Sequence, residues 1–308
     1  IMREDGKGEQ PTLGQVRAQI AQDTQLSNDQ MRIDYLAMDR QYLEMATRAF
    51  RKGTSDPEAK AMQERLLEQG VPQEALDDLA SVEMHGIQTS GNCVRNITTD
   101  QFAGVAPDET VDPRVLAELL RQWSTFQPEF AFLPRKFKIA ISSSADDRAV
   151  VQMHDIGIYA YKNAAGETRL RILAGGGLGR TPILGTIIKE DLPWQHMLTY
   201  VESAIRVYNR YGRRDNKYKA RIKILVKAIG AEKFAAEVEE EWKFSKDGPG
   251  TLTQAEFDRV AQYFQPPAYE KLPDTDASFE KHLLENKAFA RWVNRNVHAH
   301  KVPGYASV

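Results

Sequence analysis

The stretch from Leu133 to Ile141, LPRKFKIAI, constrains the fold of this chain more than any other. After Pro134 its residues alternate in character, and a period of two predicts a β-strand. The two faces of that strand would carry Phe137, Ile139 and Ile141 on one side and Lys136, Lys138 and Ala140 on the other. The apolar face requires a core, whereas the other face sets two ammonium groups beside Arg135, where like charges repel. The outer face is therefore either fully solvated or occupied by an anion.

Further patterns predict how this strand is surrounded. Three short segments are expected to be strands, and the turn Asn163–Gly166 joins the last two: Ala149–Met153, Ile156–Tyr161 and Arg169–Leu173. Six amphipathic helices are also predicted. One starts at Pro113, and one is capped by Asp215 and has Tyr218 in its buried stripe. The other four are expected from about Pro193 to Gly212, over Glu232–Trp242, around Phe257–Phe264 and from Phe279 to Trp292. The fold class is predicted as α+β, with a mixed, largely antiparallel sheet of about four to five strands flanked by helices.

The chain divides into three predicted regions. Residues 1–80 are predicted as a polar, helical N-terminal segment, and one of its helices begins at Pro72. We find no candidate catalytic or binding residues in this segment. Residues 81–245 contain the predicted sheet and its flanking helices. Residues 246–308 contain several prolines and are expected to be a helical connector into a second half that this sequence lacks.

Composition restricts the classes of partner. Among the 308 residues, 41 Lys and Arg stand against 43 Asp and Glu, a net charge of −2, so any functional positive charge must be local. A nucleic-acid interface would need a long basic strip with interleaved aromatic side chains, and nucleic acid is not an expected partner. No apolar run reaches the roughly 20 residues that span a bilayer, and the first residues lack the apolar region of a secretory signal, so neither a membrane nor secretion is expected. The single cysteine, Cys93, is consistent with a reducing cytoplasm, and no metal site is predicted.

Three other segments repeat the cationic chemistry of the strand. Thr89–Asn96 surrounds Arg95 with small and hydrogen-bonding residues, and Gly175–Thr181 combines a glycine run with Arg180. The segment from Arg206 to Lys227 holds nine cations and one acid, Asp215. The glycine run fits neither of the two common nucleotide-binding patterns. Because loops and element ends converge in a folded domain, these segments predict a cavity for a polyanion, or for a small oxyanion bound beside one.

Four motifs resemble those of a known family and occur in the order and spacing found there: Thr89–Asn96, Leu133–Lys138, Gly175–Thr181 and Arg213–Lys217. From about Ala80 to Trp242 the chain resembles the first repeat of the haemoprotein of siroheme-dependent sulfite and nitrite reductases. The resemblance implies a six-electron reduction of sulfite to sulfide, or of nitrite to ammonia, at siroheme coupled to a [4Fe-4S] cluster. It also implies a flavoprotein or a ferredoxin as electron donor.

The resemblance assigns roles to individual residues. Arg95, Lys136 and Lys138 would surround the substrate anion and supply protons. The residues that would hold siroheme carboxylates are Asn92, Asn96, Arg135, Gly175, Gly176, Gly177, Arg180, Thr181, Arg213, Arg214 and Lys217.

The chain also departs from the family. The cluster cysteines belong to the second repeat, so their ligands are not expected in this chain, which would be inactive alone and would need a partner chain or second half. The family's ferredoxin-like half domain is not recognisable in residues 1–80. The alternative function is a non-catalytic module that binds a tetrapyrrole or an oxyanion.

Overall fold

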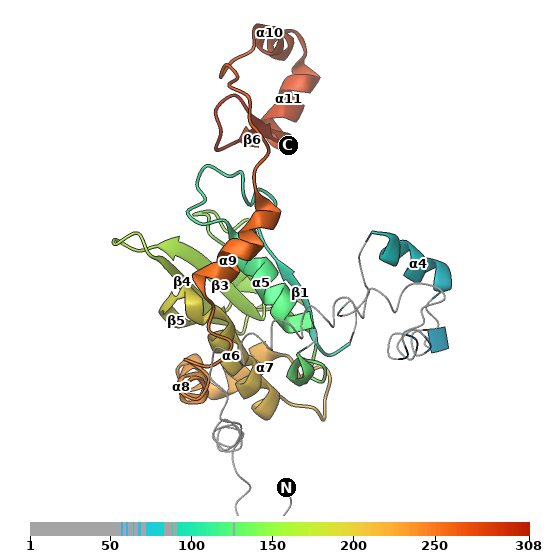
Figure 1. Cartoon of the computed structure of the whole chain (residues 1–308), viewed down its shortest axis with the longest axis vertical. Helices are drawn as coiled ribbons and strands as arrows, with labels where there is room; N and C mark the ends of the chain where they lie inside the picture. The colour runs from blue at the N-terminus through green and yellow to red at the C-terminus, as the bar shows by residue number, and fades with distance from the viewer. Residues whose placement is uncertain are drawn as a thin grey trace, which may run out of the picture.

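The computed structural model describes residues 57, 60, 64, 67–68, 72–82, 88, 91–125 and 127–308. At its centre lies a five-stranded sheet in the order β1-β2-β3-β4-β5 (Figure 1). The strands are β1 (Val94–Thr98), β2 (Phe137–Ser142), β3 (Ile156–Lys162), β4 (Thr168–Ala174) and β5 (Thr186–Pro193). Strand β2 runs parallel to β1 and β3, whereas β4 runs antiparallel to β3 and β5. The predicted α+β class and mixed sheet are confirmed, and half of the strand pairings are parallel.

Strand β2 has the predicted alternation. Phe137, Ile139 and Ile141 are fully buried in the core, and Lys138 between them is half-buried. The strand begins at Phe137, so Lys136 lies immediately before it. Ala140 on the lysine face is also fully buried, so this face is not a fully solvated surface.

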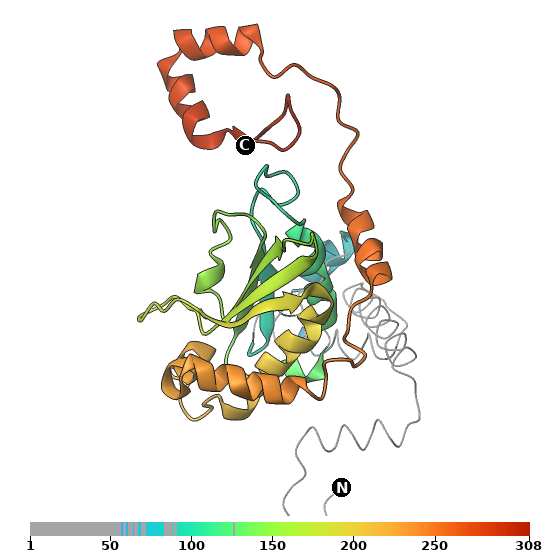
Figure 2. The same ribbon diagram turned by 90° about the vertical axis from the view of Figure 1, so that its left-hand side faces the viewer.

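Helices cover the sheet and share one hydrophobic core with it. Helix α5 packs on β1, β2 and α9, whereas α8 packs on β5, α6 and α7. Figures 1 and 2 place α7 and α8 at the end of the sheet remote from the C-terminus of the chain. These helices are α5 (Pro113–Thr125), α6 (Met197–Tyr211), α7 (Ile222–Ile229), α8 (Ala231–Trp242) and α9 (Gln254–Ala261).

One strand predicted from the sequence was wrong, and two strands were missed. The segment predicted as a strand over residues 149–153 contains the 3₁₀ turn η2 (Val151–Met153), preceded by Val150 in the left-handed region at φ 51°. Strands β1 and β5 were not predicted. Both lie at sheet edges and bury few side chains, so their sequences lack a clean apolar alternation.

Two helix assignments also change. Helix α7 begins at Ile222 rather than after Asp215, and Tyr218, predicted in its buried stripe, is 83% exposed. The predicted C-terminal helix is two helices, α10 (Ala277–Glu285) and α11 (Lys287–Asn296), because Asn286 ends the first and caps the second.

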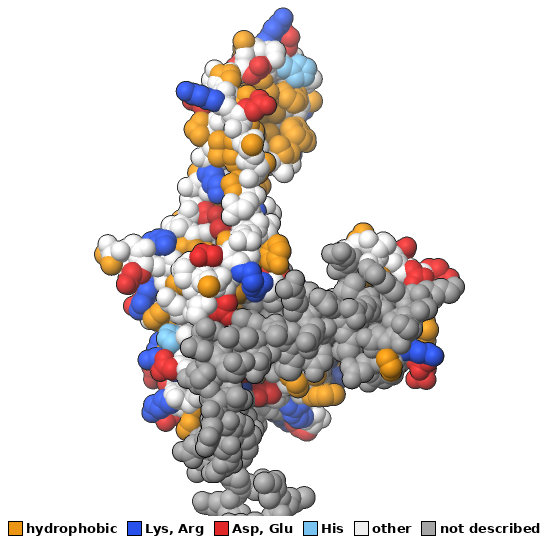
Figure 3. Space-filling view, in the orientation of Figure 1, with side chains coloured by type: hydrophobic (Ala, Val, Ile, Leu, Met, Phe, Trp, Pro, Cys, Tyr) orange, Lys and Arg blue, Asp and Glu red, His pale blue; other side chains and the backbone are white. Residues whose placement is uncertain are grey.

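The C-terminal lobe consists of α10, α11 and a two-stranded ribbon, β6 (His298–Ala299) with β7 (Ala306–Ser307). Its two helices bury no residue, and Figure 3 shows hydrophobic side chains gathered on the surface of this lobe.

In the N-terminal region, α4 (Gln73–Ser81) confirms the helix expected after Pro72. The remaining helices predicted within residues 1–80 fall largely outside the described residues, as do residues 85–87 and 89–90 of the loop before β1. Within the described part of the chain, no helix has the length and apolar character needed to cross a membrane.

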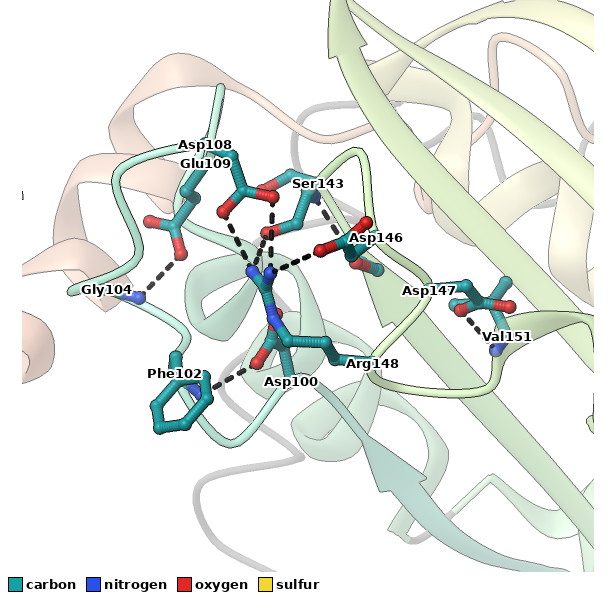
Figure 4. Close-up of polar contacts among 12 residues, drawn as sticks. Asp100, Phe102, Gly104, Asp108, Glu109, Ser143, Asp146, Asp147, Arg148 and Val151 are labelled. Atoms are coloured by element: carbon teal, nitrogen blue, oxygen red, sulfur yellow. Dashed lines mark hydrogen bonds and ion pairs between the residues drawn. The ribbon is translucent and has the colours of Figure 1, made fainter. Parts of the chain in front are cut away.

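A polar network ties the loop after β1 to the loop after β2 (Figure 4). The Arg148 guanidinium donates to Asp100 at 2.6 Å, to Asp108 at 2.9 Å and to the Ser144 hydroxyl at 2.6 Å. The Asp100 side chain is only 1% exposed, so its buried negative charge needs the Arg148 guanidinium as a partner. Asp147 accepts the N–H of Val151 at 2.7 Å and holds the start of η2.

The loop after β1 also contains a half-buried carboxyl group, that of Glu109, and contacts the C-terminal lobe. Glu109 accepts the N–H of Gly104 at 2.6 Å, and Lys301 donates its backbone N–H to Val105 at 2.8 Å. Burial raises the pKa of Glu109 to about 7, helped by Asp112 and opposed by the Gly104 N–H and by Lys301.

Candidate anion-binding site

The pairing of β1 with β2 brings the first two cationic motifs together. Leu133 donates its N–H to the Asn92 carbonyl at 2.8 Å, and Phe137 donates to the Cys93 carbonyl at 2.9 Å. Asn96 then pairs with Lys138 in the parallel ladder. The Arg95 side chain is fixed locally, because its Nε donates to the Gly91 carbonyl at 2.9 Å.

The surroundings of Lys136 are cationic. Burial lowers the pKa of Lys136, and the positive charges of its neighbours lower it further; these neighbours are Arg95, Lys138, Arg221 and Arg135. We call these four residues and Lys136 the cationic cluster. Like charges held together by the fold leave a positive potential that an anion can satisfy. The fold therefore brings Arg95 and Lys138 close to Lys136, as expected from the sequence.

Asp155 lies beneath the cluster as its internal counter-ion. Its side chain is 1% exposed and binds Arg221 at 2.6 Å. Its second carboxylate oxygen accepts the backbone N–H of Lys138 at 3.0 Å, and its carbonyl accepts the N–H of Gly175 at 3.0 Å. Burial raises the pKa of Asp155, against the opposing pull of Arg221. One residue thus connects β2, the glycine run and the segment before α7.

The glycine run after β4 is required by close packing. Gly175 has φ 84°, a conformation that glycine adopts without strain. A Cβ on Gly176 would clash with the carbonyl oxygens of Gln152 and His154, and one on Gly177 would lie 3.1 Å from the Arg221 guanidinium. Glycine at 177 therefore lets the backbone approach the cationic cluster.

Of the predicted Gly175–Gly177 amide donors, two are already used within the chain, whereas the N–H of Gly176 takes part in no backbone hydrogen bond of the described residues. The N–H of Gly175 is donated to Asp155, and that of Gly177 is donated to Ile183 at 2.9 Å. Among the backbone hydrogen bonds of the described residues, none uses the N–H groups of Leu178, Gly179 or Arg180. Arg180 and Thr181 are exposed at the tip of the same loop.

Four of the nine cations between Arg206 and Lys227 form ion pairs, three of them with acids from outside this segment. Arg206 is buried between Glu129 and Glu202, and Arg210 binds Glu241 at 2.7 Å. Sequence counting missed these partners because they come from elsewhere in the chain. Among the ion pairs of the described residues, none involves the other five cations, so the segment keeps an excess of positive charge: Arg214, Lys217, Lys219, Lys223 and Lys227.

The Arg213–Lys217 motif is more exposed than the cluster. Arg213 pairs with Asp215, and Lys217 lies 5.4 Å above the Tyr218 ring. Arg214 donates to the Phe132 carbonyl at 2.9 Å and so approaches the segment that precedes β2.

Two residues of the site were not singled out from the sequence. Arg221 appeared only as one of many cations, and Asp155 gave no signal beyond an acidic residue directly before an apolar strand. Their contact joins segments that are far apart in the chain, so no local pattern contains it.

Comparison with known proteins identifies the family. The model for the nitrite and sulphite reductase 4Fe-4S domain matches residues 90–246. Sulfite reductase [ferredoxin] 1 of Mycolicibacterium paratuberculosis is 32% identical over 173 residues, which cover 56% of this chain and 31% of the relative. The chloroplastic ferredoxin–nitrite reductase of Arabidopsis thaliana is 30% identical over 171 residues, covering 54% of this chain and 29% of the relative.

A solved structure, that of the Mycobacterium tuberculosis NirA protein, is 28% identical and matches with a TM-score of 0.46 over 50% of this chain and 28% of that one. The present chain thus spans about a third of the length of the curated relatives it matches. The family model covers just over half of the 308 residues. The chain belongs to the nitrite and sulphite reductase family.

Proposed function

We propose that residues 81–245 bind siroheme and the sulfite or nitrite reduced on it, as part of a reductase of this family. The observation that carries the proposal is the cationic surroundings of Lys136, whose charged neighbours are Arg95, Lys138, Arg221 and Arg135. Residues 246–308, with helices α9, α10 and α11, would connect this domain to the remainder of the enzyme.

The donor set fits siroheme. This tetrapyrrole carries many carboxylates, and arginine and lysine side chains are the usual partners of such groups. When bound, siroheme would supply the iron that binds the substrate and passes electrons to it. The groups proposed to hold its carboxylates are Asn92, Asn96, Arg135, Arg180, Thr181, Arg213, Arg214, Lys217 and the Gly175–Gly177 backbone. Gly175 and Gly177 would contribute close approach, because their N–H groups are already donated within the chain.

The donor set does not fit a [4Fe-4S] cluster. Such a cluster is normally held by four cysteine thiolates, and the 308 residues contain Cys93 alone. We therefore propose that the cluster ligands lie outside these residues, on a further segment or a partner chain.

Arg95, Lys136 and Lys138 are proposed to act on the substrate anion. Their positive charges would neutralise the oxyanion and orient its oxygen atoms toward them. Burial and neighbouring cations lower the pKa of Lys136, so its Nζ gives up a proton more readily than a free lysine. That proton and a second one, from Lys138 or bound water, would go to one substrate oxygen, which would leave as water as the electron donor supplies two electrons. Bulk water would then return the protons to the amines.

The electron donor is proposed to be a ferredoxin rather than a flavoprotein. Relatives named for both substrates, sulfite and nitrite, carry ferredoxin in their names. Both anions are small oxyanions that the same three cations can hold, so we propose both as candidate substrates.

Titration of the chain with siroheme, followed by absorbance, tests the proposal. We expect saturable binding that is about tenfold weaker in Lys217→Met, since Lys217 is among the residues proposed to hold siroheme carboxylates and a hydrogen bond to a charged group contributes about 1.5–3 kcal/mol. Lys243→Met is the matched control, because this exposed lysine at the C-terminal end of α8 pairs with Glu240. Absence of siroheme binding by the wild-type chain would refute the function. Binding with no turnover even after the cluster-bearing remainder of the enzyme is added would instead identify a tetrapyrrole-binding module.

A further inference from the structure

Lys223 is an unusual lysine in the first turn of α7. Its side chain is buried, with the residue 7% exposed, although a cation at this end of a helix faces the positive end of the helix dipole. Burial lowers the pKa of Lys223, and the nearby Arg221 lowers it further, whereas Asp155 raises it. A cation in such a position must be held by specific partners.

Those partners are backbone carbonyls of one loop. The Lys223 ammonium donates to Thr181 at 2.7 Å, to Leu178 at 3.0 Å and to Gly177 at 3.5 Å. An ammonium group has three N–H donors, so these carbonyls account for its full capacity. Among the ion pairs of the described residues, none involves Lys223.

The loop closes around this contact. Gly177 and Ile183 exchange two backbone hydrogen bonds, at 2.9 and 3.0 Å, and form the base of the loop. A Cβ on Gly177 would lie 3.0 Å from the Lys223 Cδ atom, so the glycine and the lysine stem pack directly on each other. With the carbonyls fixed by Lys223, the N–H groups of Leu178, Gly179 and Arg180 are left free to donate elsewhere.

We infer that Lys223 is a positioning residue, which fixes the loop Gly177–Thr181 so that its free amides and Arg180 hold one carboxylate of the bound tetrapyrrole. This inference rests on the proposed function for the identity of the ligand. Successive backbone N–H groups in a tight turn form a concave anion-binding surface, and the buried ammonium adds positive charge beneath it. Lys223 itself does not reach the ligand, because its three donors are used within the loop.

The anchoring role is tested without siroheme, by hydrogen exchange of the complete 308-residue chain. We expect Lys223→Met to speed exchange of the Gly177 and Ile183 amides about tenfold or more, because the hydrogen bonds between these two residues close the base of the loop that Lys223 fixes. Exchange of β2 should keep its wild-type rate. Lys227→Met is the matched control, since Lys227 lies one turn later on the same helix and is exposed. Unchanged exchange of the Gly177 and Ile183 amides, or an equal increase throughout the sheet, would overturn the inference.

The positioning role is tested by siroheme titration of the same variants. Lys223→Met should bind siroheme about tenfold more weakly, Lys227→Met should bind like the wild type, and Lys223→Arg should recover part of the affinity and of the exchange protection. Normal siroheme affinity in a Lys223→Met chain whose loop exchanges rapidly would overturn the positioning role. If the wild-type chain fails to bind siroheme, the proposed function fails, and the exchange data still decide whether Lys223 anchors the loop.

Discussion

Asp155, the residue immediately before β3, accepts the backbone N–H of Lys138 in the parallel strand β2 at 3.0 Å. Through its other oxygen it binds Arg221 at 2.6 Å, so one buried carboxylate sets the distance between a cationic strand and a cationic loop.

Replacing Asp155 tests this arrangement. We expect Asp155→Asn to lower the free energy of unfolding by about 2 kcal/mol, because the Arg221 charge loses its partner. Urea denaturation measures the change. The control is Asp191→Asn, which removes an exposed carboxylate that pairs with Arg169 and should leave the urea midpoint nearly unchanged. Equal effects of the two substitutions would show that Asp155 contributes no more than a surface acid.

Replacing Lys136 should separate stability from binding. Lys136 lies among four other cations, so Lys136→Met should raise the free energy of unfolding by roughly 0.5 kcal/mol in the absence of ligand, as like-charge repulsion is relieved. In the presence of siroheme and sulfite the order should reverse, since the wild-type chain gains more from the bound substrate anion. Thermal unfolding with and without these two ligands provides both values. A variant less stable than wild type without ligand would contradict the repulsion.

Glu109 should make stability depend on pH near neutrality. Its folded pKa of about 7 exceeds its ordinary value of 4.5, so the folded chain binds this proton more tightly than the unfolded chain. The resulting stabilisation is complete below pH 4.5 and is lost as pH rises through about 7. We expect Glu109→Gln to exceed wild type in unfolding free energy by about 2 kcal/mol at pH 8, and to match it near pH 4.5. Urea titrations at both pH values measure the difference, with the exposed Glu167→Gln as control. A difference that does not change with pH would exclude Glu109 as its source.

Arg148 should be the most sensitive arginine of the described loops. Arg148→Met leaves the buried Asp100 carboxylate without its partner, and we expect a loss of about 3 kcal/mol in unfolding free energy. Adding Asp100→Asn should restore part of that loss, because the uncompensated charge is removed. Arg171→Met is the control, since Arg171 and Glu190 form an exposed pair. If the double variant is no more stable than Arg148→Met alone, the buried charge is not the cause.

Sequence patterns predicted the elements whose burial follows a simple period. Strand β2 alternates between core and cluster, and helix α5 begins at Pro113 after Asp112, so both could be predicted locally. Strand β1 could not, because Val94 is its only fully buried residue. Its existence depends on hydrogen bonds to β2, which lies beyond an intervening helix.

The candidate site was predictable in its charges but not in its pairings. The residues Arg95, Lys136 and Lys138 follow from motif and alternation. The neutralised cations, such as Arg206 with Glu129, could not be separated from free ones because their partners come from other elements. Likewise, nothing in the local sequence of Lys223 distinguishes a buried anchor from a surface cation.

The strand order of the sheet follows the order of the chain, which has a consequence for synthesis on the ribosome. Each strand can pair with the one made just before it, so the sheet can assemble while the chain is still emerging. Asp155 is synthesised before Arg221, so its carboxylate lacks that partner until the segment before α7 has been added. This ion pair can therefore close only after all five strands have been synthesised, and the cationic cluster is complete only once Arg221 has been added.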